Sequence, residues 1–284
     1  MKKILLTTSA LTLIAGAAAA DVSVSGYGRI GISSTGGTST QYTRMQTTFS
    51  GTSTTDSGLS FNAQTRYQSG GSSNTGATGV FAGPSFSISN GAMTLALGNN
   101  GGAIASNAGI WGCGEVMWGC GDMADSSFTS QWATRQSTQA GMNIIRLDMA
   151  LGGASVSVSG GNDNDTELAV SMPMGGGSVG IGYDNDNAAA ASNPITQINY
   201  SGSMSGLGVG VKLLQQNAVS AYMASVSAPA GAGSVYVYAG KTIAESNNYG
   251  LRYNQSLGGG ASLHVGANNI SGATTVGAGI HFGF

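Results

Sequence analysis

The sequence predicts an all-β protein: a transmembrane antiparallel β-barrel of about 16 strands, with one long loop folded into the lumen. The final segment shows the pattern most clearly, because apolar and small or polar residues alternate along it. One face of this segment carries Val276, Ala278, Ile280, Phe282 and Phe284. A strand of about ten residues that is apolar on one face only is the unit of a membrane barrel, although a half-buried strand of a soluble sandwich alternates in the same way.

An export signal at the start of the chain favours the barrel. Residues 1–3 are Met-Lys-Lys, residues 4–15 are mostly apolar, and residues 17–20 are four alanines. This is the pattern of a secretory signal peptide, and the apolar run is too short for a spanning helix. We therefore expect a signal peptide at 1–20 and the outer-membrane β-barrel at 21–284. No later segment approaches a spanning helix, so a membrane location would require strands.

The chain is rich in glycine and poor in charge, with 48 glycines and 8% charged residues. Such a composition is typical of disordered segments, but disordered chains lack the regularly spaced apolar positions found here. Without Lys2 and Lys3 of the signal peptide, 8 basic residues accompany 12 acidic ones, a net charge of −4. The chain has no basic stripe to neutralise phosphates, which excludes a nucleic-acid-binding protein.

Glycine-rich turns divide the remaining chain into strand-length segments. Glycine supplies the positive φ that tight hairpins need, and such turns occur at 56–58, 90–91, 152–153, 175–177, 205–206, 230–233 and 258–260. The alternating segments predict sixteen strands, at 22–33, 44–54, 59–68, 80–89, 93–98, 142–151, 154–160, 167–172, 178–183, 195–203, 207–215, 219–228, 234–240, 248–256, 261–269 and 273–284. An even strand number, with short turns and both termini on one side and longer polar stretches on the other, is the layout of a bacterial outer-membrane barrel.

One connection, at about 99–140, contains no convincing strand. A stretch of this length without secondary structure usually carries function when it occurs in a compact protein. In a barrel wide enough to hold water it can fold inward and narrow the lumen. We therefore expect a constriction loop here.

At three places the chain resembles a Gram-negative general diffusion porin of the alphaproteobacterial type. These are Ala-Ala-Asp-Val-Ser-Val-Ser-Gly at 19–26, Thr-Asp-Ser-Gly-Leu-Ser-Phe at 55–61, and Gly-Ala-Gly-Ile-His-Phe-Gly-Phe at 277–284. The resemblance implies a sixteen-stranded homotrimer in the outer membrane, among lipid and lipopolysaccharide, with the third loop folded into the lumen. It also implies that the barrel insertion machinery reads Phe284, and that loop acids face wall arginines across the constriction.

Strand alternation places the arginines. Arg29 lies opposite in parity to the apolar Val24 and Ile30 of its strand, which sends it into the lumen. The same rule gives five arginines of the pore-lining wall: Arg29, Arg44, Arg66, Arg146 and Arg252. The alternative is that they are scattered solubilising charges. It is disfavoured because a charge on the lipid face costs roughly 2–4 kcal/mol at mid-membrane.

The long loop supplies charges of the opposite sign, Glu115, Asp122 and Asp125. Acids facing arginines across a narrow pore would produce a strong transverse field, because the effective dielectric there is below that of bulk water. The alternative is that these acids only solvate an outer loop.

The same loop contains both cysteines, in the repeated tetrapeptides Trp-Gly-Cys-Gly at 111–114 and 118–121. Cys113 and Cys120 are close in sequence in an exported chain, which favours a disulfide because the periplasm oxidises thiols. A redox or metal switch is the alternative, but two cysteines cannot complete a structural zinc site.

Two acidic runs flank the turn at 175–177. Asp163 and Asp165, with Glu167 at the end of their run, precede it, and Asp184 and Asp186 follow it, so the hairpin brings the two runs together at the outer rim. Their carboxylates are suitable hard ligands for calcium. The more favoured interpretation is that they are ordinary loop residues.

The sequence does not indicate an enzyme, and we expect no organic cofactor. It contains no His-Glu-x-x-His, and no serine–acid constellation accompanies His264 and His281. The resulting hypothesis is a water-filled channel for passive diffusion of small hydrophilic solutes and ions. The rival is a secreted Gly/Ser/Thr-rich surface adhesin or β-solenoid passenger, which would need a fixed short repeat; the turns here are irregularly spaced.

Overall fold

The computed structural model describes residues 21–71, 79–108, 143–161, 166–185, 194–216, 218–241 and 247–284. The elements in chain order are β1 (Asp21–Thr35), β2 (Thr38–Thr54), β3 (Ser60–Gly71), β4 (Val80–Phe81), β5 (Ser85–Ser89), β6 (Met93–Gly98), the π-helical turn η1 (Ile104–Ala108), β7 (Ile144–Leu151), β8 (Ala154–Gly161), β9 (Thr166–Met174), β10 (Gly177–Asp184), β11 (Ile195–Met204), β12 (Leu207–Gln216), β13 (Val219–Ala230), β14 (Gly233–Lys241), β15 (Asn247–Gly258), β16 (Ala261–Ile270) and β17 (Ala273–Gly283).

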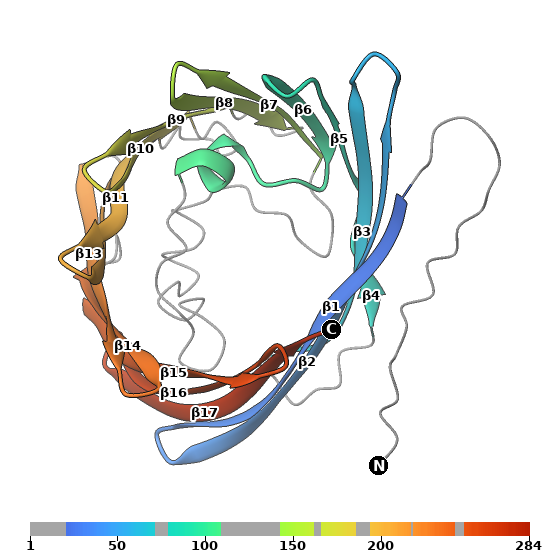
Figure 1. Cartoon of the computed structure of the whole chain (residues 1–284). Helices are drawn as coiled ribbons and strands as arrows, with labels where there is room; N and C mark the ends of the chain where they lie inside the picture. Colours follow the sequence, from blue (N-terminus) through green and yellow to red (C-terminus); the bar gives the residue numbers. More distant parts are fainter. Residues whose placement is uncertain are drawn as a thin grey trace, which may run out of the picture.

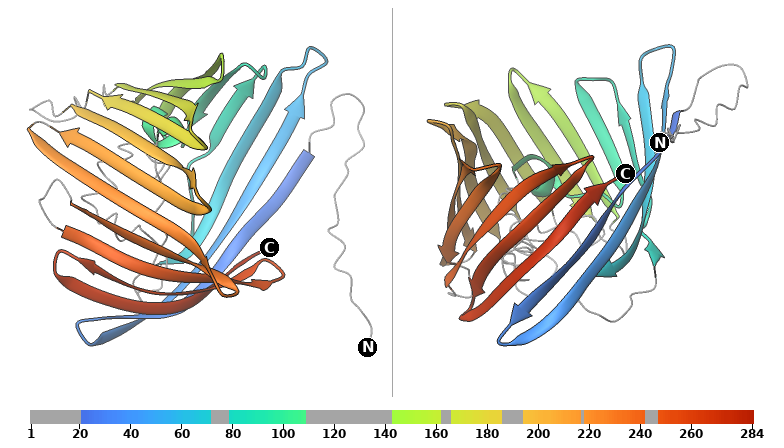
Figure 2. Two further views of the ribbon diagram at one scale, coloured as in Figure 1. Left: turned by 60° about the vertical axis from the view of Figure 1, so that its left-hand side comes forward. Right: turned by 60° about the horizontal axis from the view of Figure 1, so that its bottom comes forward.

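The strands form one closed antiparallel barrel. Each strand pairs with its neighbours in the sequence, and β1 pairs with both β2 and β17, which closes the ring seen in Figure 1. β4 and β5 both pair with β3, so they are two parts of one barrel strand and the barrel has sixteen strands. The strands run obliquely across the wall (Figure 2), as closure of a barrel requires. The predicted fold class is confirmed.

The strand predicted at 80–89 is interrupted, because ladder pairing stops at residues 82–84. Pro84 has no N–H to give to a ladder. The Ala82 N–H instead donates to the Arg66 carbonyl at 2.8 Å, and the Thr65 hydroxyl donates to the Ala82 carbonyl at 2.8 Å. The interruption therefore stays attached to β3 without continuing the regular register.

The first hairpin also differs from the prediction, which left a long polar stretch at 34–43. β1 continues to Thr35, and β2 begins at Thr38 after a two-residue turn. Gly36 and Gly37 have φ values of 57° and 85°, and such a turn matches the twist of a tight hairpin. The sequence did not predict these strand ends, because the segment consists mainly of polar Ser, Thr and Gln residues without apolar alternation. Backbone pairing and the glycine turn hold the two strands together instead.

The outer face of the barrel is apolar. Large side chains such as Ile30, Ile145 and Leu251 are each more than half exposed, at 51%, 61% and 51%. A soluble protein would bury such residues, whereas a membrane barrel presents them to lipid. No helix among the described residues is long and apolar enough to cross a membrane.

The seam between β1 and β17 is covered by two aromatic rings. Phe284 exchanges backbone hydrogen bonds with Gly26, at 2.8 and 3.0 Å. A Cβ on Gly26 would lie 2.7 Å from the Phe284 ring, and one on Gly28 would lie 2.3 Å from the Phe282 ring. The rings therefore rest directly on glycine backbone, which has no room there for a side chain.

Replacing Gly28 by valine should lower the yield of folded barrel, because the new side chain overlaps the Phe282 ring at the closing seam. Gly51→Val on β2 is the matched control, since a Cβ at Gly51 meets no atom within 4 Å. Folded barrel is measured as the fraction that migrates compactly on a gel until boiled. Equal folded fractions for the two variants would show that the seam does not need Gly28.

Candidate functional site

The start of the long connection identifies the inner face of the wall. η1 lies inside the ring in Figure 1 and contacts β8, β9 and β10. The Ala103 N–H donates to Ser159 Oγ at 2.8 Å, and the Ile104 N–H donates to Glu167 Oε2 at 3.1 Å. Ser159 and Glu167 therefore face the lumen. The part of the long loop that the structure describes, residues 99–108, enters the barrel as predicted.

The inner face can be followed from strand to strand through the register of the sheet, because directly opposed residues of antiparallel strands lie on the same face. Glu167 is opposite Asp184, Arg252 is opposite Tyr236, and His281 is opposite Arg29. The inner positions reached in this way include Asp184, Asn199, Lys212, Ser225, Tyr236, Arg252, His264, His281, Arg29, Arg44 and Arg66.

Four of the five predicted arginines gather on one side of the inner wall. Arg252 is on β15, Arg29 on β1, Arg44 on β2 and Arg66 on β3, and we call this group the arginine wall. His264 and His281 occupy β16 and β17 between Arg252 and Arg29. Six adjoining strands thus present basic side chains to the lumen.

Neutral aromatic and amide groups support these arginines. The Arg29 guanidinium carbon lies 4.5 Å from the centre of the Tyr27 ring, and that of Arg44 lies 5.8 Å from the same centre. Arg252 lies 5.9 Å from the Tyr236 ring. Arg44 also donates a hydrogen bond to the Gln68 side chain.

Apart from Asp21 at the start of β1, the described carboxylates of the inner wall lie on the other side, on β7, β9 and β10. Arg146, the fifth predicted arginine, also lies there and forms an ion pair with Asp148, with Nε 2.9 Å from Oδ1. It donates a further hydrogen bond to the Gly101 carbonyl. Arg146 therefore does not add to the arginine wall. Its charge is offset by Asp148 and it holds the start of the long loop.

Glu167 and Asp184 are inner-wall acids that the sequence interpretation missed. It assigned both to acidic loop runs, and Asp184 to a calcium site at the rim. In the structure they are opposed on β9 and β10 and only 0% and 1% exposed. Parity with the exposed Leu168 and Tyr183 would have placed them in the lumen, as it did the arginines.

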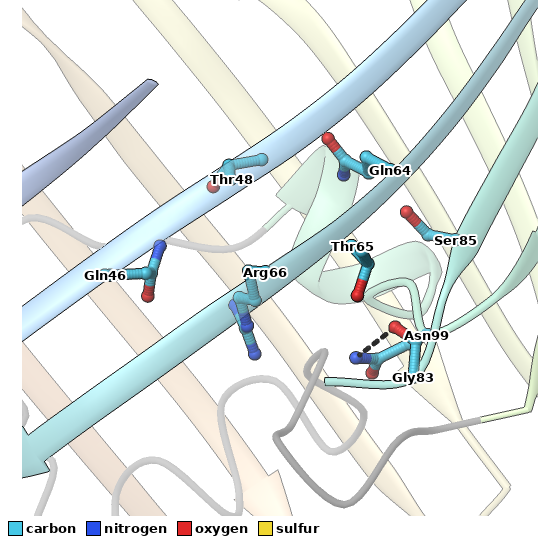
Figure 3. A pocket seen from close by; sticks show the side chains of 8 residues that line it. All are labelled: Gln46, Thr48, Gln64, Thr65, Arg66, Gly83, Ser85 and Asn99. Carbon is cyan, nitrogen blue, oxygen red and sulfur yellow. Dashed lines mark hydrogen bonds between the residues drawn. The ribbon is translucent and has the colours of Figure 1, made fainter. Parts of the chain in front are cut away.

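A polar cavity of about 240 Å³ adjoins the arginine wall beside the interruption between β4 and β5 (Figure 3). Arg66 supplies its one charged side chain, and amides and hydroxyls supply most of the remaining surface. The lining residues are Gln46, Thr48, Gln64, Thr65, Arg66, Gly83, Ser85 and Asn99. The Asn99 amide donates to the Gly83 carbonyl at 3.2 Å, which attaches the start of the loop to the wall.

The closed barrel and its charged lumen agree with the comparison with known proteins. A family model described as Gram-negative porin matches residues 7–275. The chain belongs to the Gram-negative porin family. This porin forms a water-filled diffusion channel of the outer membrane, and its closed barrel leaves no support for the adhesin or β-solenoid alternative.

Solved structures show the same fold at low sequence identity. A structure from work on the asymmetric conductivity of engineered proteins matches with a TM-score of 0.78 and 18% identity, covering 93% of this porin and 100% of that chain. Two variants of the porin of Rhodopseudomonas blastica match over the same shares of the two chains. Their TM-scores are 0.77 and 0.70, at 19% and 17% identity. No curated protein matches this porin at a significant level.

Several predicted site residues lie outside the described part of this porin: Cys113, Cys120, Glu115, Asp122, Asp125, Asp163, Asp165 and Asp186. The disulfide, the loop acids and the calcium site therefore stay predictions. Among the described residues, no group of three or more His, Cys, Asp or Glu side chains is placed to hold a metal ion. The predicted loop at 99–140 also contains Arg135, so its three acids and one arginine give it a net charge of −2.

Glu167 anchors the start of the pore loop in this porin. Its carboxylate accepts the Ile104 N–H and the Ser159 hydroxyl, the latter at 3.2 Å. A Cβ on Gly102 would lie 2.0 Å from Glu167 Oε2, so a side chain at 102 would displace the carboxylate. Asn107 adds hydrogen bonds to the Ser155 and Ala169 carbonyls, at 2.8 and 3.3 Å.

Glu167→Ala should loosen the loop, because it leaves the buried Ile104 N–H without its acceptor, a loss of about 1–3 kcal/mol. We expect greater open-channel current noise in single-channel recordings. Glu167→Gln is the control, since the amide keeps an oxygen that can accept the same bond and should change the noise less. Current noise in Glu167→Ala equal to that of the unmodified porin would contradict the anchoring role.

Proposed function

We propose that segregated charges on the inner wall determine which small hydrophilic solutes and ions this porin passes. The observation that supports the proposal is the position of the arginine wall on β15, β1, β2 and β3, with Glu167 and Asp184 across the lumen on β9 and β10. Transport is passive and follows the concentration gradient. It involves no turnover chemistry.

The mechanism depends on a field across the pore. Charges of opposite sign on facing walls act through a lumen whose effective dielectric is below that of bulk water, so their field is stronger than it would be in free solution. Solutes with dipoles orient in this field, whereas apolar solutes must shed their ordered water and are disfavoured. We further propose that Glu115, Asp122 and Asp125 of the loop add to the acidic side.

Replacing Arg29, Arg44 and Arg66 together by alanine should raise both the conductance and the cation-to-anion permeability ratio. The change removes three of the four positive charges of the arginine wall and widens the lumen, so the acids are opposed less strongly. Both quantities follow from planar-bilayer recordings, the second from the reversal potential in a salt gradient. The effect should weaken as salt rises above 0.1 M, where the Debye length is about 10 Å.

The matched control for this variant is the pair Arg146→Gln and Asp148→Asn, which removes an ion pair without changing the net charge. Its reversal potential should stay close to that of the unmodified porin. A reversal potential that the triple alanine variant leaves unchanged would mean that these arginines do not line the conduction path.

We also propose the partners and processing that the porin family implies. The chain is exported through a signal peptide at residues 1–20, assembles as a homotrimer, and lies among outer-membrane lipid and lipopolysaccharide. The insertion machinery recognises Phe284. What supports this last proposal is the position of Phe284 at the closing seam, where its ring covers Gly26.

Phe284→Ala separates recognition from barrel stability, because alanine keeps the backbone hydrogen bonds to Gly26. We expect less folded porin in the outer membrane of cells, measured by heat-modifiable migration. Refolding of the purified variant in detergent micelles should be unchanged, since no machinery is present there. An unchanged amount in cells would refute recognition, and equal losses in cells and in micelles would assign Phe284 a purely structural role.

A further inference from the structure

Two arginines of the wall face each other directly. Arg29 of β1 and Arg44 of β2 are cross-strand partners, and the Cβ atoms of such partners are roughly 4.5–5.5 Å apart. Like charges in this arrangement repel and destabilise a sheet. The pair therefore requires compensation from its surroundings.

Tyr27 provides part of that compensation. Both guanidinium groups lie near its ring, at 4.5 Å for Arg29 and 5.8 Å for Arg44, and an aromatic ring within about 6 Å attracts a cation. The ring is itself held in place. It stacks on His281 with 5.3 Å between ring centres, and its hydroxyl donates to Gln46 Oε1 at 3.2 Å. Tyr27 thus fixes two arginines beside each other on the lumen wall.

The two guanidinium groups retain the capacity to bind a ligand. Each has five N–H donors, so it can keep a protein contact and still donate to an oxyanion. The nearest described carboxylate on β1 or β2 is Asp21, eight residues before Arg29, a distance of about 26 Å along a strand.

We propose that Arg29 and Arg44, positioned by Tyr27, form a binding site for a small divalent oxyanion, such as hydrogen phosphate or sulfate, inside the pore. Planar guanidinium groups match the oxygen spacing of phosphate and sulfate and bind them through paired N–H donors. A doubly negative ion also removes the repulsion between both cations at once. Chloride has a single charge and offers no pair of oxygens. Binding must remain weak enough for the ion to leave, as conduction requires.

This inference rests on the proposed function for its physiological role, but its test does not depend on conduction. Isothermal titration calorimetry of the purified porin in detergent would compare sodium phosphate and sodium sulfate with chloride and acetate at constant ionic strength. Planar-bilayer recordings of chloride current with added phosphate form the second measurement. We expect heat of binding for the two divalent oxyanions and a phosphate-dependent decrease in chloride current.

The variants distinguish an organised site from general positive charge. Arg44→Lys keeps the charge but loses the planar donor pair, so phosphate affinity should fall about tenfold. Tyr27→Leu should weaken phosphate binding to a similar degree, and Tyr27→Phe should bind nearly as the unmodified porin does. Arg146→Lys, at the arginine already paired with Asp148, is the matched control and should not change phosphate affinity.

Heat-modifiable migration would first show that each variant is folded. Phosphate affinity no greater than chloride affinity in the unmodified porin would overturn the inference. Loop carboxylates that occupied the arginine pair would give this result. Unchanged phosphate affinity in Arg44→Lys and Tyr27→Leu would overturn it as well, because net charge alone would then account for binding. A folded porin that passes no ionic current would refute the proposed function, and calorimetry would still decide the inference.

Discussion

Satisfaction of backbone hydrogen bonds in lipid is the constraint on which the rest of this structure depends. Hydrocarbon offers no partner for an unpaired N–H or C=O, so strands can cross a membrane only in a sheet without edges. The pairing of β1 with β17 removes the last two edges. Gly26 and Gly28 allow Phe284 and Phe282 to cover that join, so the closing seam combines backbone pairing with apolar packing on its lipid-facing side.

Closure also determines where charge can lie. Once lipid surrounds the outer face, the alternation of a strand leaves only the lumen for charged residues. The positively and negatively charged side chains of the inner wall have different kinds of partner. Arg29 and Arg44 lie against an aromatic ring and an amide, whereas Glu167 accepts a backbone N–H and a hydroxyl. Neutral partners of this kind hold a side chain in place without cancelling its charge. Asp148, in contrast, offsets the charge of Arg146.

Local alternation was enough to predict sixteen strands and the lumen position of Arg29, because side-chain direction in a strand depends only on parity. Alternation did not predict the features that depend on turn geometry, on proline or on the register between strands. The polar hairpin at Gly36–Gly37 depends on turn geometry, and the break before Ser85 depends on a proline. Glu167 was misplaced because an acidic run was interpreted by composition. The facing of Arg29 and Arg44 requires register between strands, which one sequence does not contain.

The placement of Tyr27 connects the fold to selectivity. Two opposed arginines repel each other across the β1–β2 pair. A ring that attracts both cations through its π electrons stabilises the pair and carries no charge of its own. The His281 stack and the Gln46 hydrogen bond hold that ring from β17 and β2, the two strands that flank β1. The geometry of the arginine pair therefore depends on the same closure that keeps the barrel in the membrane, since His281 reaches Tyr27 only across the β1–β17 seam.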